Sequence, residues 1–430
     1  MYISNALDKN QAGLTIGGAN AVALAQEFGT PLYVMDENTI VANMRAYNDV
    51  INKEYNGNGI VFYASKAFCT KDMCRIAHRE GLGLDVVSGG ELYTALSAGV
   101  PAEKLCMHGN NKDDSEIADA VCAGVGRIVA DGLDEIIRID KEAAKQGKIQ
   151  KILIRVKPGI DAHTHEFIMT GQNDSKFGVS LETGEALEVI LKAAALPNIN
   201  LAGVHCHIGS QIFDTEPFCH AAEKMIGLIA EAKKCGVVLT ELDLGGGFGI
   251  RYTKEDNPRP YAEYTADVIR TVIAESDKAG IDRPFIMLEP GRSIVGEAGI
   301  TLYTVGAIKD IPGIRKYVSV NGGMADNPRY IMYDAEYTAL AAERPDAPAE
   351  EKITICGKSC ESGDILIKDI MMPRLQSGEL LAVLSTGAYN YSMSSNYNRI
   401  PRPAIVMVKD GVARLSVKRE TYQDILRNDL

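Results

Sequence analysis

Between residues 37 and 294, short apolar segments alternate with segments long enough to form helices. Each apolar segment is bounded by glycine or polar residues, as buried strands of parallel sheets are. Eight such repeats predict a (β/α)8 barrel, a fold that places active-site residues at the carboxyl ends of its strands. The strand candidates are GIVFYASKA (59–67), GLDVVSGG (83–90), KLCMHGNN (104–111), RIVADG (127–132), KILIRVKPG (151–159), LAGVHCHIGS (201–210), ELDLGGGFG (241–249) and FIMLEPGR (285–292).

The pattern changes after residue 294. Strand-like segments now follow one another through turns with few helices between them, which predicts a second, mainly antiparallel β domain over 295–430. The segment TPLYVMD (30–36) also reads as a strand and precedes the barrel. We therefore expect residues 1–36 to join 295–430 in the β domain and residues 37–294 to form the barrel.

Charge and cysteine content restrict the partners and the compartment. The 57 acidic and 45 basic residues give a net charge of −12, which disfavours non-specific binding to nucleic acid or to an anionic membrane. The first ten residues lack the features of a signal peptide, and no apolar run approaches the roughly 20 residues of a membrane span. Nine scattered cysteines do not suggest a disulfide framework. We expect a cytoplasmic enzyme.

Lys66 lies within the first strand candidate, in the mostly apolar stretch VFYASKAF (61–68). An unpaired ammonium buried in such a strand costs several kcal/mol. Two interpretations are open at this point. Lys66 could lie at the end of the strand and extend its ammonium to water, or it could be partly neutral or engaged covalently as a Schiff base.

His205 and His207 are two residues apart in HCHIGSQ, a spacing that puts two side chains on one face of a strand. One interpretation is a pair of metal ligands. Metal sites of this kind usually need further histidines, and all seven histidines precede residue 221, so we expect no catalytic metal. A histidine that stacks on a planar cofactor fits better, with Ser210 at a following turn suited to phosphate.

Three consecutive glycines, Gly245 to Gly247, follow the seventh strand candidate. Their backbone N–H groups could approach an anion closely, although glycines required only by a tight turn are the alternative. A Rossmann site is not expected, because Ile250 stands where the third glycine of G-x-G-x-x-G belongs. After the eighth strand, a buried Glu289 would need a partner, which could be a protonated pyridine nitrogen or Arg292.

A lysine after the first strand, a histidine after the sixth, a glycine loop after the seventh and a carboxylate after the eighth would all lie at one end of the barrel. This set suits pyridoxal phosphate, a phosphorylated aromatic aldehyde.

With these residues in place, the chain resembles the fold-type III pyridoxal-phosphate enzymes, most closely the diaminopimelate decarboxylase family. The resemblance extends over nearly the whole chain and implies a homodimer with two shared active sites and conversion of meso-diaminopimelate to L-lysine and CO2. The motifs that carry it are GTPLYVMD (29–36), FYASKAF (62–68), SGGEL (88–92), TGQNDSKFG (170–178), HCHIGSQ (205–211), DLGGGFG (243–249), EPGRSIV (289–295), CGKSCESGDIL (356–366) and GAYNYSMSSNYN (387–398).

The resemblance also implies roles for individual residues. Lys66 matches the Schiff-base lysine, His207 the residue stacked on the cofactor ring, and Cys360 a proton donor supplied by the partner subunit. Glu289 matches the partner of the pyridine nitrogen. Further cofactor contacts match Ser210, Gly245, Gly246, Gly247, Pro290, Gly291, Arg292 and Tyr389. The substrate-binding positions match Arg292, Arg329, Tyr333, Glu361 and Tyr389.

Related enzymes on the same scaffold remain alternatives at the level of sequence. The resemblance pairs a Cys–Asp with ornithine- or arginine-type decarboxylases, whereas this chain has Cys360–Glu361. Two arginines, Arg292 and Arg329, suit a substrate with a second carboxylate better than a diamine precursor. Carboxynorspermidine decarboxylase belongs to the same group of alternatives. A racemase would not carry the CESGD and GAY motifs, and a catalytically silent cofactor-binding regulator would not need Cys360.

Overall fold

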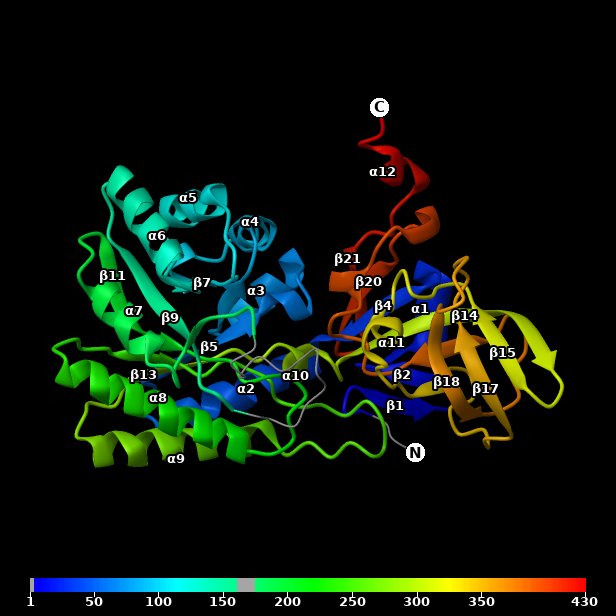
Figure 1. Cartoon of the computed structure of the whole chain (residues 1–430). Coiled ribbons are helices and arrows are strands. Elements are labelled where there is room, and N and C mark those ends of the chain that lie inside the picture. The colour runs from blue at the N-terminus through cyan, green and yellow to red at the C-terminus, as the bar shows by residue number, and fades with distance from the viewer. Residues whose placement is uncertain (1–3, 161–174) are drawn as a thin grey trace. The chain divides into compact units, whose positions relative to one another are not determined.

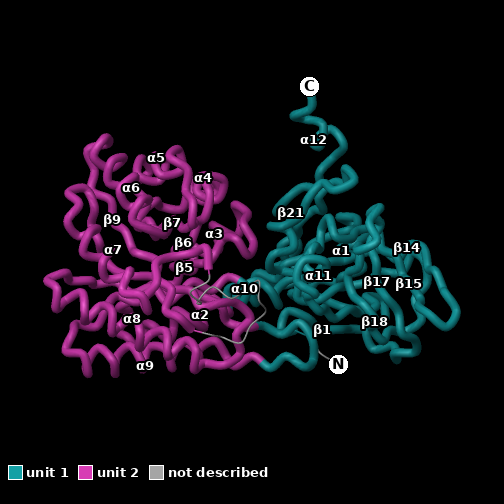
Figure 2. The backbone as a smooth tube through the Cα atoms, in the orientation of Figure 1, with its two compact units in different colours: residues 1–42, 250–257, 292–430 teal, residues 43–249, 258–291 magenta. Residues whose placement is uncertain are grey.

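The computed structural model describes residues 4–160 and 175–430. The chain divides into two compact units (Figure 2). We call Asn43–Gly249 with Pro258–Gly291 the barrel unit, and Met1–Ala42 with Ile250–Asn257 and Arg292–Leu430 the β unit. Relative to the boundaries expected at residues 37 and 294, the β unit also takes in residues 37–42, the excursion 250–257 and residues 292–294.

Within the described residues, the barrel unit contains eight parallel strands that close on themselves (Figure 1). The closure is made by β13 pairing with β5 and by β8 pairing with β9. The predicted (β/α)8 barrel is therefore confirmed, with all eight strand candidates found. The strands are β5 (Gly59–Ala64), β6 (Gly83–Val86), β7 (Leu105–Met107), β8 (Arg127–Ala130), β9 (Gln150–Lys157), β11 (Ile199–His205), β12 (Glu241–Asp243) and β13 (Phe285–Leu288).

The barrel interior changes from apolar to ionisable along the strands. A buried layer inside the barrel is formed by Phe62, Cys106, Val129, Leu153, Ala202 and Met287. Because strand side chains alternate, residues two positions further along point to the same side. Within β9 this places Arg155 on the same side as Leu153, while His108 and Glu289 are the first residues after the ends of β7 and β13 and contact each other. The apolar layer therefore supports a layer of ionisable groups at the carboxyl ends of the strands.

Helices of regular length connect the strands. Their starts are fixed locally: Thr70 and Ser88 accept hydrogen bonds from backbone N–H groups at the beginnings of two helices, and Asp113 forms a capping box with Glu116 at a third. The helices of the barrel unit are α2 (Glu37–Glu54, which begins in the β unit), α3 (Lys71–Arg79), α4 (Gly89–Ser97), α5 (Asp114–Ala123), α6 (Leu133–Lys145), α7 (Glu185–Ala194), α8 (Glu216–Lys234) and α9 (Tyr261–Ala279).

The β unit is built on a mainly antiparallel sheet in the order β18-β17-β15-β14-β4-β20-β21, with β19 also pairing β14 and β16 pairing β19. The early strand β4 pairs with β14 on one side and with β20 on the other. The strands are β4 (Leu32–Asp36), β14 (Gly299–Ile311), β15 (Arg315–Val320), β16 (Ala339–Ala341), β17 (Glu351–Cys356), β18 (Ile365–Met372), β19 (Leu380–Val383), β20 (Ala404–Lys409) and β21 (Val412–Val417).

Smaller elements complete the two units. The β unit also contains a three-stranded sheet and four short helices. In the barrel unit, the short strand β10 pairs with β9. Among the described residues, none of the helices combines the length and apolarity that crossing a membrane requires. The smaller elements are β1 (Leu7–Asn10), β2 (Gly13–Ile16), β3 (Ala19–Asn20), α1 (Ala21–Phe28), α10 (Arg292–Val295), α11 (Arg329–Tyr333), α12 (Tyr422–Leu426) and β10 (Val179–Ser180).

Candidate active site

Lys66 lies in a turn that follows the first barrel strand. Strand β5 ends at Ala64, Ser65–Ala67 forms a 3-10 turn, and the Lys66 side chain is exposed. The prediction that Lys66 belongs to a buried strand is therefore wrong, and no buried ammonium has to be stabilised there. Of the two interpretations, the structure places Lys66 at the strand end, where its amine is accessible to a reactant.

The Lys66 turn packs against the end of the eighth strand. The Ala64 N–H donates to the Pro290 carbonyl at 3.2 Å. A Cβ atom at Gly291 would lie 3.0 Å from Ala64 Cβ and 3.1 Å from Ala67 Cβ, closer than ordinary contact. A glycine at position 291 therefore allows the segment after β13 to lie close to the turn after β5 that carries Lys66.

Glu289 lies just after β13, and two imidazoles contact its buried carboxylate. His108 Nε2 is 2.6 Å from Oε1, and His205 Nε2 is 3.1 Å from Oε2. Burial opposes ionisation, but His108 and His205 together hold the pKa of Glu289 well below its usual range. Burial also lowers the pKa of His205 to about 4 despite Glu289, so His205 donates as a neutral imidazole. Glu289 is therefore a carboxylate in a site that excludes water.

His207 follows β11, which ends at His205, so the alternation rule does not extend to it. The Gly246 N–H donates to His207 Nδ1 at 3.3 Å. Desolvation, then the nearby Lys66 ammonium, lowers the pKa of His207 well below its ordinary value. Lys66, His207 and Glu289, three of the residues expected at the site, thus interact electrostatically at one end of the barrel.

The three glycines after β12 allow close packing of the backbone against neighbouring segments. The Gly245 N–H donates to Asp243 Oδ1 at 2.8 Å, and the Gly246 N–H is used by His207. A Cβ at Gly246 would lie 2.2 Å from the Glu289 carbonyl oxygen, and one at Gly247 would lie 2.4 Å from that of Gly209. Within the described residues the Gly247 N–H has no hydrogen-bond acceptor. Of the three glycine N–H groups, that of Gly247 is therefore the one able to bind an anion. Ser210, which is half-buried, follows Gly209 in the neighbouring loop.

In the β unit, two buried arginines converge on one tyrosine. Arg292 Nη1 donates to the Tyr252 hydroxyl at 2.6 Å, and the Arg329 guanidinium lies 4.9 Å from the centre of the Tyr252 ring. Arg292 also lies 4.8 Å from the ring centre of Tyr389, whose φ of 65° is uncommon for a bulky residue. Arg329 Nη1 in turn donates to the Tyr337 hydroxyl at 2.7 Å.

Arg329 is buried without an acidic partner. It is 7% exposed, and no carboxylate of the described residues forms an ion pair with it. Burial opposes its charge, but Tyr252 and Tyr337 raise its pKa, so it stays cationic. A buried guanidinium surrounded by phenol rings is suited to bind a carboxylate that arrives with a ligand.

Cys360 and Glu361 lie in the loop between β17 and β18, and both are exposed. The Cys360 N–H donates to Asn398 Oδ1 at 2.7 Å. The buried Asp364 accepts hydrogen bonds from the N–H groups of Ser359 and Met324, each at 2.7 Å. Hydrogen bonds from the loop backbone to Asn398 and to Asp364 therefore hold the loop in place.

Tyr333 differs from the expected arrangement around Arg329. It ends α11 and is half-exposed, whereas the tyrosine that contacts Arg329 is Tyr337, four residues later. The role of Tyr333 in substrate binding stays a prediction. The first part of the TGQNDSKFG motif, residues 170–174, lies outside the described residues.

Several partners of these residues were not predicted. His108, Tyr252 and Tyr337 lie outside the motifs, whereas Asp243 and Asn398 stand at the ends of DLGGGFG and GAYNYSMSSNYN. No role was expected for any of the five, and only their places at strand ends or in motifs could have suggested them. Cys106, His108, Asp243 and Glu289 each offer a possible metal-ligand atom, all within 4.8 Å of one another. The positions of the histidines alone led us to expect no catalytic metal, and the absence of a metal stays a prediction.

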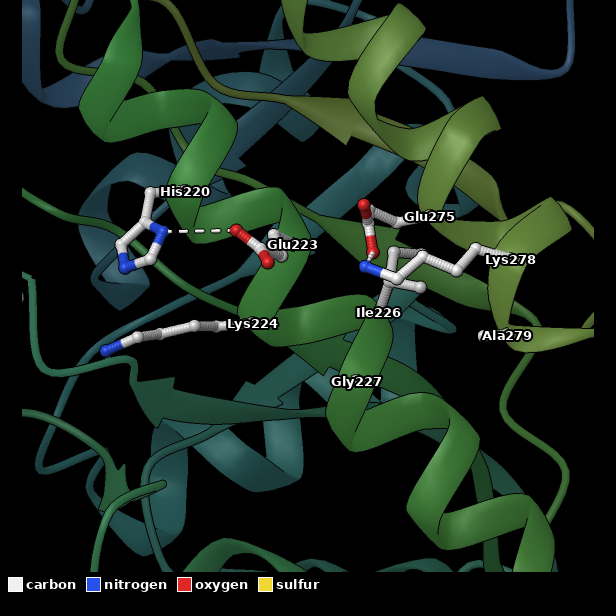
Figure 3. A pocket seen from close by; sticks show the side chains of 8 residues that line it. All are labelled: His220, Glu223, Lys224, Ile226, Gly227, Glu275, Lys278 and Ala279. Atoms are coloured by element: carbon white, nitrogen blue, oxygen red, sulfur yellow. Dashed lines mark hydrogen bonds and ion pairs between the residues drawn. The ribbon is translucent and has the colours of Figure 1, made fainter.

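A surface depression between α8 and α9 contains none of these residues (Figure 3). His220 pairs with Glu223 at 3.2 Å on α8, and Lys278 pairs with Glu275 at 2.9 Å on α9. Because its charged side chains largely neutralise one another along each helix, the depression offers little to a charged ligand.

Comparison with known proteins places the chain in a family. Residues 37–296 match the model of the pyridoxal-dependent decarboxylases, pyridoxal binding domain. A diaminopimelate decarboxylase of Bacillus subtilis is 49% identical over 435 residues, with 100% of this chain and 98% of the relative covered.

Solved structures agree with the sequence relatives. The diaminopimelate decarboxylase of M. jannaschii in complex with L-lysine superimposes with a TM-score of 0.93 at 34% identity, covering 100% of this chain and 99% of the other. A lysine/ornithine decarboxylase of Vibrio vulnificus has a TM-score of 0.77 at 23% identity over 90% of this chain and 97% of its own, a likeness of fold alone. The chain therefore belongs to the pyridoxal-dependent decarboxylases and, among them, to the diaminopimelate decarboxylase family.

Proposed function

We propose that this protein is a pyridoxal-phosphate-dependent enzyme that decarboxylates meso-2,6-diaminopimelate to L-lysine and CO2, the last step of lysine biosynthesis. The observation that carries the substrate assignment is Arg329, a buried cation with no acidic partner among the described residues. Together with Arg292, which also contacts Tyr252, it suits a substrate that brings a second carboxylate.

The residues of the barrel unit fit the cofactor. Lys66 offers an accessible amine for the aldehyde, Glu289 is an ionised partner for a protonated pyridine nitrogen, and the Gly247 N–H is available for a phosphate oxygen. His207, neutral and half-exposed, suits stacking on the ring. When bound, pyridoxal phosphate supplies a conjugated ring that accepts the electron pair left behind when CO2 departs. Glu289 holds the proton on the ring nitrogen, which keeps the ring able to do so.

The substrate-binding residues lie in the β unit. Arg292 and Arg329 bind the distal carboxylate, with Tyr333 and Tyr389 as further contacts, and Glu361 binds the distal ammonium. The distal groups are thereby fixed, and the carboxylate that leaves is the one on the α-carbon at the other end of the substrate. Cys360 then delivers a proton to that carbon as a general acid.

We further propose that Cys360 acts in the partner subunit's site, so that the active form is a homodimer with two shared sites. Its exposure on the loop between β17 and β18 supports this, because a donor to another chain has to be accessible. The nine cysteines are all free thiols, which supports a reducing compartment such as the cytoplasm.

The test is a decarboxylation assay with meso-diaminopimelate, ornithine, arginine and lysine as separate substrates, with and without added pyridoxal phosphate. We expect cofactor-dependent CO2 release and lysine formation with meso-diaminopimelate alone. Glu361→Ala should weaken that activity greatly while leaving cofactor absorbance intact, since it removes the carboxylate proposed to bind the distal ammonium. A preference for ornithine or arginine would assign the protein to the diamine-forming enzymes instead.

A further inference from the structure

Two buried carboxyl groups lie close together at the end of the barrel interior. Asp243, the last residue of β12, is completely buried, and Glu289 is 7% exposed. One oxygen of each belongs to the set of possible ligand atoms that lie within 4.8 Å of one another. Two ionised carboxylates at this separation and burial would repel each other strongly, and neither could be hydrated.

The hydrogen-bond partners of the two groups are unequal. Glu289 has His108 beside Oε1 and His205 beside Oε2. Asp243 Oδ1 accepts from the Gly245 N–H at 2.8 Å, and its Oδ2 has no donor among the described residues. Glu289 Oε1 likewise accepts no well-aligned hydrogen bond, although His108 is close. The side chains of Asp243 and Glu289 interact as hydrogen-bond partners. A single proton shared between the two carboxyls would therefore give each group a further partner.

The surroundings decide which carboxyl holds that proton. The titratable and charged groups that interact with Asp243 are Cys106, His108, Arg127, Cys206 and Glu289. Arg127 is engaged by Glu241 through hydrogen bonds of 2.6 and 2.9 Å. His108 is shared with Glu289 and Asp85. Asp243 therefore has no ion-pair partner of its own among the described residues. Burial and the charge of Glu289 raise the pKa of Asp243 well above its ordinary value.

We propose that Asp243 is a positioning residue that stays protonated and donates its proton from Oδ2 to Glu289. Together with His108 and His205, it holds Glu289 as the carboxylate that the cofactor nitrogen requires. This role in catalysis rests on the proposed function, in which Glu289 is the partner of that nitrogen. The protonation state of Asp243 itself is a property of the protein without any cofactor and can be tested separately.

The first experiment is infrared difference spectroscopy of the cofactor-free protein at about pH 8.5, wild type minus Asp243→Asn. Asp85, Glu91 and Asp326, whose pKa values are raised to about 6, 7 and 7, are then ionised and contribute little. We expect a protonated carboxyl C=O stretch in the wild type that shifts in D2O and is absent from Asp243→Asn. A wild type without such a band, or a band that persists in the variant, would overturn the proposal. Should Asp243→Asn not fold, Asp243→Ala replaces it in the subtraction.

The second experiment measures the dissociation constant of pyridoxal phosphate by absorbance titration. In Asp243→Asn, an amide can still donate to Glu289 and accept from the Gly245 N–H, so affinity should stay within about threefold of wild type. In Asp243→Ala, Glu289 loses a donor and the affinity should fall by roughly tenfold or more. A large loss in Asp243→Asn would show that the charge of Asp243 is needed and would contradict the proposal. If no variant, including wild type, bound the cofactor, the proposed function would fail while the infrared result would stand.

Discussion

Arg292 donates a 2.6 Å hydrogen bond to the hydroxyl of Tyr252, and Arg329 lies over the ring of the same tyrosine. Tyr252 belongs to the segment Ile250–Asn257, which lies between β12 and α9 in the chain and is part of the β unit. It thereby fixes the spacing of the two guanidiniums that we assign to the distal carboxylate of the substrate. The Tyr337 ring packs T-shaped against the Tyr252 ring, with 5.3 Å between the ring centres, and holds Tyr252 in place.

Tyr252→Phe should therefore impair substrate binding more than cofactor binding. The variant keeps the ring but removes the hydroxyl that orients Arg292, and a hydrogen bond to a charged group is worth about 1.5–3 kcal/mol. We expect KM for meso-diaminopimelate to rise roughly tenfold, with pyridoxal phosphate affinity unchanged. Tyr422→Phe, at a side chain that is 74% exposed, is the matched control. An unaltered KM in Tyr252→Phe would show that the arginines are positioned without it.

Lys66 should carry the cofactor covalently. Borohydride reduction of the protein loaded with pyridoxal phosphate should fix the label on the peptide that contains Lys66, because an imine is reduced to a stable amine. Lys66→Ala should lose both the labelling and nearly all turnover. Lys71→Ala, an exposed lysine five residues away at the start of α3, should keep both. Peptide mapping by mass spectrometry decides, and a label on another lysine would refute the assignment.

Asp326 should make the protein less stable as pH rises toward neutrality. Burial raises the pKa of its carboxyl to about 7 although Tyr303 and the Gly323 N–H donate to it. The folded chain therefore keeps a proton that the unfolded chain releases near its ordinary pKa of 3.8. The stabilisation is complete below about pH 4 and is lost as pH rises through about 7, a change on the order of a few kcal/mol.

Asp326→Asn should remove that contribution to the pH dependence. The amide oxygen can still accept from the Tyr303 hydroxyl, but the side chain no longer titrates. Urea unfolding at about pH 5, 6 and 7 should show a variant whose free energy of unfolding falls less steeply than that of wild type. Asp346→Asn, at an exposed side chain, serves as control. Parallel slopes for Asp326→Asn and wild type would mean that Asp326 is already ionised at about pH 5.

Mixing two inactive variants should restore activity if the sites are shared. Lys66→Ala and Cys360→Ala should each be nearly inactive. After subunit exchange, one of the two sites of each hybrid dimer would contain both intact residues. Random exchange makes half of the dimers hybrid, so recovery should approach about a quarter of wild type, as two-fold pairing dictates. Verified exchange without recovery would place Lys66 and Cys360 in the same chain's site or deprive Cys360 of a catalytic role.

Asp364 should control the order of the loop that carries Cys360. Its carboxylate is buried and accepts the N–H groups of Ser359 and Met324. Asp364→Ala leaves both donors without a partner, a cost of about 1–3 kcal/mol each where they stay buried. We expect faster hydrogen exchange over residues 357–363 and a reduced kcat, with cofactor affinity retained. The exposed Asp310→Ala is the control; unchanged exchange in Asp364→Ala would show that Asn398 suffices to hold the loop.

From the amino-acid sequence alone, the barrel strands and the end of the barrel at which the site lies could be predicted. Apolar segments separated by helix-length stretches identified all eight barrel strands, because hydrophobic periodicity is a local property. Parallel strands of a closed barrel end at the same face, so Lys66, His207, Gly245 to Gly247 and Glu289 could be grouped without knowing any distance. Among the described residues, six strands were not predicted: β1, β2, β3, β10, β16 and β18. The first five have four residues or fewer, and β18 alternates irregularly between buried and exposed residues.

The exact position of Lys66 and the partners of the charged residues could not be predicted without the folded structure. Ser65, Ala67 and Phe68 are buried around Lys66, so the local pattern could not distinguish a strand from the 3-10 turn that follows it. The two imidazoles beside Glu289 come from β11 and from the residue after β7, and Arg329 contacts a tyrosine 77 positions earlier in the chain. Such contacts depend on strand register and on the path of the chain between distant segments. Neither leaves a local sequence pattern, because the energy that fixes them comes from packing between segments far apart in the chain.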